Sequence, residues 1–330
     1  MTTGQVAVKS NAVFELNLEL YRKLYLIRRA EEKIQEHYFE DEMKTPVHLS
    51  LGKEAIEVGI CHALNSQDQL FGTYRSHGIY LARSGETDAF FAELYGKETG
   101  LIKGKAGSMH LCAPECGLMV TSAIVASSIP VAVGAAYANR VKGSNAVVVV
   151  FFGDGATEEG VFWESLNIAC LMKLPILFVC EDNGLAVCTT PEFRRGYNCI
   201  TDIVSQYDCT LLAQDSTDAE LIYHLASEAV ESVRNGSGPY FLHLKYYRYL
   251  EHVGVNEDFD AGYRSKKEFE KWYARDPVNS QRTKLLELGM QEYELARLEE
   301  EIDNQVGSSI RLAKQGRCAE TEELYRDVIE

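Results

Sequence analysis

Residues 146–155 read AVVVVFFGDG, a run of seven apolar residues that leads directly into a glycine–aspartate–glycine turn. Four consecutive valines within an apolar run predict a strand that is buried on both faces. Residues 159–173 follow with helical periodicity, and Pro175–Cys180 forms a second apolar run. A strand, a helix and another strand in this order predict a βαβ unit whose two strands are parallel.

The same alternation continues toward the C-terminus. Residues 209–213 (CTLLA) predict a weaker strand, and residues 217–234 predict a helix that ends at the breaker cluster NGSGP, residues 235–239. Residues 240–246 then predict another strand. Strands that alternate with helices at this spacing indicate an α/β fold, with a parallel sheet flanked by helices on both faces.

The segments on either side of this region differ in character. Residues 13–43 carry leucines at helical spacing and predict a helix, and another helix is expected after Ser50. Residues 71–122 are dense in Gly, Ser and Thr, which indicates loops that line a site. Beyond residue 263 the chain is charged and helical in pattern. We therefore expect three parts: an N-terminal helical arm (1–45), a central ligand-binding domain (46–262) and a C-terminal helical extension (263–330).

Composition and charge exclude several classes of protein. The hydrophobic fraction is 46%, which is enough for a large core, and no apolar run is long enough for a membrane span. The first residues lack the apolar segment of a secretion signal, and nine cysteines without regular spacing indicate a reducing compartment, so we expect a cytoplasmic protein. A net charge of −16 argues against nonspecific binding of nucleic acid.

Asp154 and Asn183 form the most informative pair of polar residues. Asp154 follows the first predicted strand, and Asn183 follows Gly155 after twenty-seven intervening residues, at the end of the next strand. The carboxyl ends of parallel strands lie on one edge of the sheet, where such folds bind ligands. A carboxylate and an amide oxygen suit Mg²⁺, and Gly153 and Gly155 allow a phosphate to approach the backbone. The following helix would direct its N-terminal amides at that phosphate.

This pattern resembles the diphosphate–metal motif of thiamine-diphosphate enzymes, GDG followed by Asn after twenty-seven residues. The resemblance extends over residues 18–300 and is closest to the alpha subunits of pyruvate and branched-chain 2-oxo-acid dehydrogenases. It rests on six segments in the order of that family: TYRSHG (73–78), KGKAGSMH (103–110), GDGATEEGVFWESLNIACLMKLPILFVCEDNGLAV (153–187), YRYLEH (247–252), GYR (262–264) and DPV (276–278).

The resemblance implies a cofactor and its ligands. Mg²⁺ would be bound by the side chains of Asp154 and Asn183 and by the backbone carbonyl of Leu185, where the family usually has Tyr. Arg75 would donate to phosphate oxygens as a bidentate group, and Val125 would pack against the aminopyrimidine. The full set of expected contacts to thiamine diphosphate is Tyr74, Arg75, Val125, Asp154, Gly155, Ala156, Asn183 and His252.

Three histidines match family positions near the reactive centre. His252 matches the second histidine of the family's HGHS loop and is expected to handle substrate, His48 lies beside the active-site channel, and His77 is either catalytic or orders the TYRSHG loop. The HGHS loop of the family reads Leu250-Glu251-His252-Val253 in this chain, so the serine that kinases modify in some relatives is replaced by Val253. Glu251 would raise the proton affinity of His252 if the two side chains interact.

The resemblance also implies partners. The glutamate that activates the cofactor comes from a beta subunit in this family, so the chain should be inactive alone; Glu54 is a weaker local alternative because acidic residues are favoured in a first helical turn. Two alpha and two beta subunits would decarboxylate a small 2-oxo acid and pass the acyl unit to a lipoyl-bearing acyltransferase or carrier protein. Two other functions stay open: a split transketolase-like or acyloin-forming enzyme, and a noncatalytic scaffold.

Overall fold

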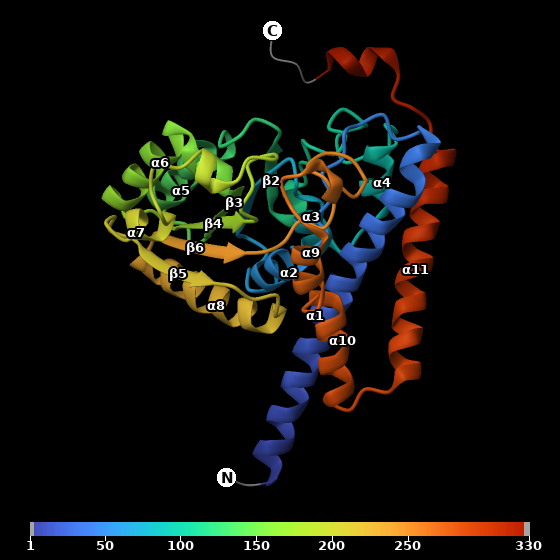
Figure 1. Ribbon diagram of the computed structural model, residues 1–330, viewed down its shortest axis with the longest axis horizontal. Coiled ribbons are helices and arrows are strands. Elements are labelled where there is room, and N and C mark those ends of the chain that lie inside the picture. Colours follow the sequence, from blue (N-terminus) through green and yellow to red (C-terminus); the bar gives the residue numbers. More distant parts are fainter. Residues whose placement is uncertain (1–2, 327–330) are drawn as a thin grey trace.

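The computed structural model describes residues 3–326, and within them six strands form one parallel sheet in the order β2-β1-β3-β4-β6-β5. Figure 1 shows the sheet between two layers of helices, with the long helices α1 and α11 running beside it. The predicted α/β class, a parallel sheet with helices on both faces and helical segments at both ends, is confirmed. None of the helices in the described part of the chain is long and apolar enough to cross a membrane.

The strands are β1 (Gln69–Thr73), β2 (Leu118–Ser122), β3 (Val148–Gly153), β4 (Ile176–Asp182), β5 (Thr210–Gln214) and β6 (Tyr240–Lys245). The α-helices are α1 (Thr3–His37), α2 (Glu54–His62), α3 (His77–Ser84), α4 (Asp88–Leu94), α5 (Ser128–Lys142), α6 (Gly160–Leu171), α7 (Ile200–Val204), α8 (Ala219–Ser232), α9 (Lys266–Tyr273), α10 (Pro277–Glu287) and α11 (Glu292–Gln315). Short 3-10 turns include η1 (Tyr38–Glu40), η3 (Asp154–Glu158) and η4 (Pro191–Phe193).

The apolar run before the GDG turn supplies both sides of the sheet. Successive side chains of a strand point to opposite faces, so the odd-numbered residues from 147 to 151 join one core cluster and the even-numbered residues from 148 to 152 join the other. The first cluster includes α1, α2 and α8, and the second includes α5, α6 and α7. All six of these side chains are fully buried, as expected for a strand without polar alternation.

Two predicted stretches differ from the observed elements, the first of them, the helix over residues 13–43, only in its bounds. The first helix ends at His37 and a 3-10 turn follows, because Asp41 adopts a φ of 58°, which a continuing α-helix does not allow. Residues 71–122, expected to be loops, also contain most of β1 and all of α3, α4 and β2. These elements are only five to eight residues long, too short to show a clear periodicity. The division into three parts stays a prediction.

A buried guanidinium joins the N-terminal helix to two other elements. Arg28 on α1 donates from Nε to Glu54 Oε1 of α2 and from Nη2 to Asp276 Oδ2, both over 2.7 Å. Asp276 is also the N-cap of α10, where its Oδ1 accepts from the backbone N–H groups of Val278 and Asn279. Both carboxylates are fully buried, so neither charge can be satisfied by water instead.

We expect Asp276→Ala to lower the free energy of unfolding by about 3–5 kcal/mol, because it removes a helix cap and leaves Arg28 with one carboxylate for a buried charge. The measurement is urea denaturation of the purified chain. Asp215→Ala is the control, since its ion pair with Arg275 is about half exposed and should contribute less than 1 kcal/mol. Equal losses in the two variants would contradict the prediction.

Candidate active site

A cavity of about 240 Å³ opens at the carboxyl edge of the sheet. It is formed where five strands end: the last residues of β1, β2 and β3 line it, and residues directly after β4 and β6 complete its wall. This is the edge at which open parallel sheets bind ligands. The lining side chains and backbone include Thr73, Tyr74, Arg75, Ser122, Val125, Gly153, Asp154, Gly155, Ala156, Glu181, Asn183, Leu185, Tyr246 and His252.

The cavity brings together most of the residues that the sequence singled out, although they come from positions 74 to 252. Two of the three candidate histidines do not line it: His48 packs against Tyr74 of its wall, and His77 is fully buried. The residues of the predicted site that do line the cavity are Tyr74, Arg75, Val125, Asp154, Gly155, Ala156, Asn183, Leu185 and His252.

Of the two carboxylate oxygens of Asp154, one has hydrogen-bond partners and the other has none. Oδ2 accepts from Arg195 Nη2 over 2.9 Å and also from Arg194 Nη2, whereas the buried Oδ1 has no hydrogen-bond partner. Burial, followed by repulsion from Asp182, raises the pKa of Asp154 to about 6, although both arginines act to lower it. A buried, unpaired carboxylate oxygen is costly unless a cation or donor meets it, so Oδ1 suits a metal ligand.

Asn183 stands beside Asp154 in the same cavity. Its Nδ2 donates to Tyr246 Oη over 2.7 Å, and its Oδ1 accepts from the backbone N–H of Leu185 over 2.9 Å. These contacts fix which atom of the amide faces the loop and leave Oδ1 one further lone pair. A carboxylate oxygen, an amide oxygen and a nearby loop backbone are hard ligands, so the residues present fit Mg²⁺.

The helix predicted over residues 159–173 is confirmed as α6, Gly160–Leu171. The 3-10 turn η3, Asp154–Glu158, separates it from β3, a feature that the sequence did not indicate. Gly155 matters for space, since a Cβ there would lie 3.0 Å from the Cβ of Ala186, tighter than normal packing. The backbone that lines the cavity at Asp154, Gly155 and Ala156 is thus part of a 3-10 turn and not of the helix α6.

Arg75 lines the cavity and also supports it. Its Nη1 donates to the carbonyl of Leu49 over 2.8 Å and its Nη2 to the carbonyl of His252 over 2.7 Å. A guanidinium has five N–H groups, so these two bonds leave others for an anion. The side chain is buried, which strengthens any contact with a phosphate group.

Tyr74, His48 and His252 form an aromatic cluster at one side of the cavity. The ring of His48 lies 4.4 Å from that of Tyr74 and 5.2 Å from that of His252, centroid to centroid. Burial first, and then the positive charge of Arg75, lowers the pKa of His252 to about 4 and that of His48 to about 3. Both imidazoles are therefore neutral near pH 7.

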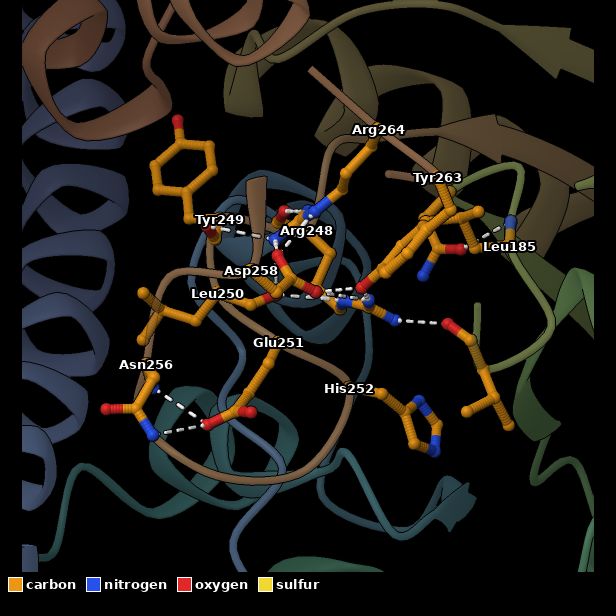
Figure 2. A network of polar contacts seen from close by, with 12 residues as sticks. Leu185, Arg248, Tyr249, Leu250, Glu251, His252, Asn256, Asp258, Tyr263 and Arg264 are labelled. Carbon is orange, nitrogen blue, oxygen red and sulfur yellow. Dashed lines mark hydrogen bonds and ion pairs between the residues drawn. The ribbon is translucent and has the colours of Figure 1, made fainter. Parts of the chain in front are cut away.

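The condition under which Glu251 would raise the proton affinity of His252, contact between the two side chains, is not met. Glu251 turns away and accepts from Asn256, so the pKa of His252 is lowered by burial, Arg75 and Arg248 rather than raised by a neighbouring carboxylate. Figure 2 shows the two side chains leaving the loop in different directions.

Arg248 ties the loop of His252 to the loop of Leu185. Its Nε donates to the carbonyl of Leu250 over 2.9 Å and its Nη1 to the carbonyl of Val187 over 3.1 Å (Figure 2). Arg264 in turn donates to the Arg248 carbonyl and to Asp258. The two loops that carry predicted cofactor ligands are thus linked through one buried side chain.

His77 has the contacts of a residue that orders a loop. It is fully buried, with Nδ1 3.1 Å from Glu31 Oε1 on α1 and Nε2 2.7 Å from Ser108 Oγ. It therefore joins the TYRSHG segment to α1 and to the GKAGSMH segment, rather than facing the cavity.

A buried lysine behind the cavity was not found from the sequence. Lys53 Nζ donates to both carboxylate oxygens of Glu181, at 2.9 Å each, and to the carbonyl of Arg75 over 2.7 Å. Glu57 lies 3.1 Å from the same Nζ. Lys53 directly precedes α2, and Arg194 and Arg195 lie in a loop. No local sequence pattern connects Lys53 with Glu181, or the two arginines with Asp154.

Comparison with known proteins agrees with this geometry. The sequence profile of the family described as "Dehydrogenase E1 component" matches residues 22–322. The chain belongs to this family. It is 32% identical over 315 residues to the alpha subunit of acetoin:2,6-dichlorophenolindophenol oxidoreductase from Bacillus subtilis (strain 168), a match that covers 95% of this chain and 93% of the relative.

Pyruvate dehydrogenase relatives are equally similar. The E1 component subunit alpha from Rhizobium meliloti (strain 1021) is 34% identical over 317 residues, 96% of this chain and 90% of that one, and the Zymomonas mobilis subunit is 32% identical over 314 residues, 94% and 88% of the two chains. These matches confirm the resemblance drawn from the sequence: the chain is an E1 alpha subunit of a thiamine-diphosphate-dependent oxidoreductase.

The lowered pKa of the buried His48 predicts that the stability of this E1 chain depends on pH. Because the pKa of His48 is about 3 when folded and about 6.5 when unfolded, the unfolded chain binds more protons between these values. Stability should therefore fall as pH is lowered through 6.5, by about 1.4 kcal/mol at pH 5.5 from this one group.

The measurement is the free energy of unfolding at pH 7.5 and 5.5. In His48→Gln we expect the difference between the two values to shrink by about 1.4 kcal/mol, whereas His224→Gln, at an exposed position, should leave it unchanged. An unaltered pH dependence in His48→Gln would show that this imidazole is not kept neutral by its surroundings.

Proposed function

We propose that this E1 alpha subunit binds thiamine diphosphate with Mg²⁺ and, with a beta subunit, decarboxylates a small 2-oxo acid and passes the acyl unit to a lipoyl-bearing acyltransferase or carrier protein. The observation that carries this proposal is the unpaired Oδ1 of Asp154, which is buried in a cavity that Asn183 and Arg75 also line. A buried anionic oxygen without a donor needs a cation.

The chain's own residues would bind and orient. Asp154 and Asn183 would hold the cation through side-chain oxygens, and Leu185 through its carbonyl. The free N–H groups of Arg75 would hold the diphosphate. When bound, thiamine diphosphate supplies the electron sink for decarboxylation. His252, neutral at pH 7, offers one ring nitrogen as donor and the other as acceptor to the oxygens of a 2-oxo acid.

The activating glutamate would come from the beta subunit. Glu54, the local alternative, is fully buried and bonded to Arg28 and to the backbone N–H of Gly52, so it does not reach the cavity. Of the three glutamates that line the cavity, Glu181 is held by Lys53 and Glu158 by Arg194, while Glu159 is an exposed residue at the start of α6.

The outer face of α5 and α6 fits the beta subunit. Large apolar side chains lie exposed along it, among them Val131, Tyr137, Val141, Ile168 and Leu171, the last with 79% of its surface exposed. Both helices start directly after residues of the cavity wall. A contiguous exposed apolar face indicates a protein interface, and this one continues from the cavity into which the partner would place its glutamate.

An acyloin substrate is the second proposal. The specific observation in its favour is the similarity to the acetoin oxidoreductase alpha subunit, which is as high as the similarity to pyruvate dehydrogenase subunits. A noncatalytic scaffold is less well supported, because it gives no use for the unpaired carboxylate oxygen of Asp154.

The proposal predicts activity that depends on Asp154. The chain co-purified with its beta subunit would be assayed for reduction of an artificial electron acceptor with pyruvate, branched-chain 2-oxo acids or acetoin, with and without thiamine diphosphate and Mg²⁺. Asp154→Asn keeps the shape but removes the charge, so we expect kcat to fall at least about 100-fold, corresponding to several kcal/mol of lost metal contact.

Asp208→Asn, in an exposed ion pair with Lys173, is the matched control and should behave as the native protein. Turnover of acetoin but of none of the 2-oxo acids would favour the second proposal. Native activity in Asp154→Asn would disprove the metal site.

The interface is tested separately by Leu171→Asp. Burying a new charge against the partner should reduce recovery of the beta subunit in co-purification at least about tenfold, while the exposed position leaves the stability of the chain alone unchanged. Leu221→Asp on α8, at the opposite layer of the sheet, is the control. Full recovery of the beta subunit with Leu171→Asp would place the interface elsewhere.

A further inference from the structure

The loop that carries His252 is closed on itself by the side chain before it. Glu251 Oε1 accepts from the backbone N–H of Asn256 over 2.9 Å and from Asn256 Nδ2 over 3.0 Å, while the backbone N–H of Glu251 donates to the carbonyl of Asn256 over 3.0 Å. Figure 2 shows the two hydrogen bonds from Asn256 to the Glu251 carboxylate, the Glu251–Asn256 clasp. One carboxylate oxygen thus receives two of the three hydrogen bonds that join the ends of residues 251–256.

The inside of this turn is fitted to the carboxylate. Gly254 has a φ of 116°, which disfavours other residues, and a Cβ there would overlap Glu251 Oε1. The turn is also attached to its surroundings, because Gly254 N–H donates to the carbonyl of Val47 over 2.8 Å and Gln35 Nε2 donates to the carbonyl of Val255 over 2.8 Å.

His252 lies inside the closed segment and is held at its backbone carbonyl and at its ring. Its carbonyl accepts from Arg75 Nη2 over 2.7 Å, and its ring packs edge-on against Tyr74 at 5.4 Å between centroids. The carboxylate of Glu251 is engaged with Asn256 and points away from the imidazole (Figure 2). Any influence of Glu251 on His252 therefore passes through the backbone of the turn.

We propose that Glu251 is a positioning residue, whose carboxylate closes the 251–256 turn and so holds His252 in the cavity. The inference rests on the proposed function in one respect, namely that His252 contacts the substrate. An oriented group contributes to rate through its pre-set position, and a small misplacement costs up to about 100-fold. Without the Glu251–Asn256 clasp, the 251–256 turn would be less ordered, and the His252 ring would have to reach its position in the cavity again in each turnover.

The test uses the alpha–beta complex loaded with thiamine diphosphate and Mg²⁺. Backbone hydrogen exchange of peptides that span residues 251–262 is measured by mass spectrometry, together with kcat and KM for the 2-oxo acid and Kd for the cofactor. For Glu251→Ala we expect exchange at the Asn256 amide to rise at least about tenfold and kcat to fall about 10–100-fold, with cofactor Kd within about twofold of native, since Asp154 and Asn183 are untouched.

Glu251→Gln separates the clasp from an effect of charge. The glutamine Oε1 can accept both bonds from Asn256, so native exchange and at least half of native kcat should return. Glu257→Ala, an exposed acidic residue of the same loop, is the control and should match the native complex.

A glutamine variant as impaired as the alanine variant would overturn the proposal in favour of a charge effect, and unchanged exchange in Glu251→Ala would overturn it outright. The exchange arm requires no turnover. If the native complex is inactive, the proposed function fails, while exchange still decides whether Glu251 closes the turn.

Discussion

A parallel sheet covered by helices on both faces imposes one constraint from which the site follows: polar side chains can meet a ligand only where the strands end. In β3 every residue from 148 to 152 is buried against one helical layer or the other, and the first polar side chain after it is Asp154. The next two strands in the sheet, β4 and β6, end directly before Asn183 and Tyr246. The cavity is therefore a consequence of how the core is built.

Burial at this edge makes every charge there depend on a partner. Glu181 is paired with Lys53, and Asp182 lies 2.7 Å from His243 Nε2, so that each carboxylate has its own basic group. Removing one partner of such a pair leaves an uncompensated buried charge. This dependence explains why so few side chains around the cavity are free to respond to a ligand, and why Oδ1 of Asp154 stands out.

The sequence was sufficient for features that repeat locally or follow from strand order. The run from 146 to 152 is long, apolar and followed by glycines, so its strand and the edge position of Asp154 and Asn183 could be predicted. Lys53, Arg194 and Arg195 could not, because their partners Glu181 and Asp154 are distant in sequence and only the tertiary fold selects them. The direction of Glu251 was missed for a similar reason: proximity to His252 in sequence says nothing about the Asn256 amide that captures the carboxylate.

Leu185 and His252 line the cavity from two separate loops, whose relative position must be held by contacts between them. Arg248 supplies the link, because its guanidinium donates to the carbonyls of Val187 and Leu250, while its own carbonyl accepts from Arg264. With only 2% of its surface exposed, this side chain has little water with which to replace these bonds. A shift of either loop must therefore break buried hydrogen bonds, so the Leu185 loop and the His252 loop are held as one rigid unit around the cavity.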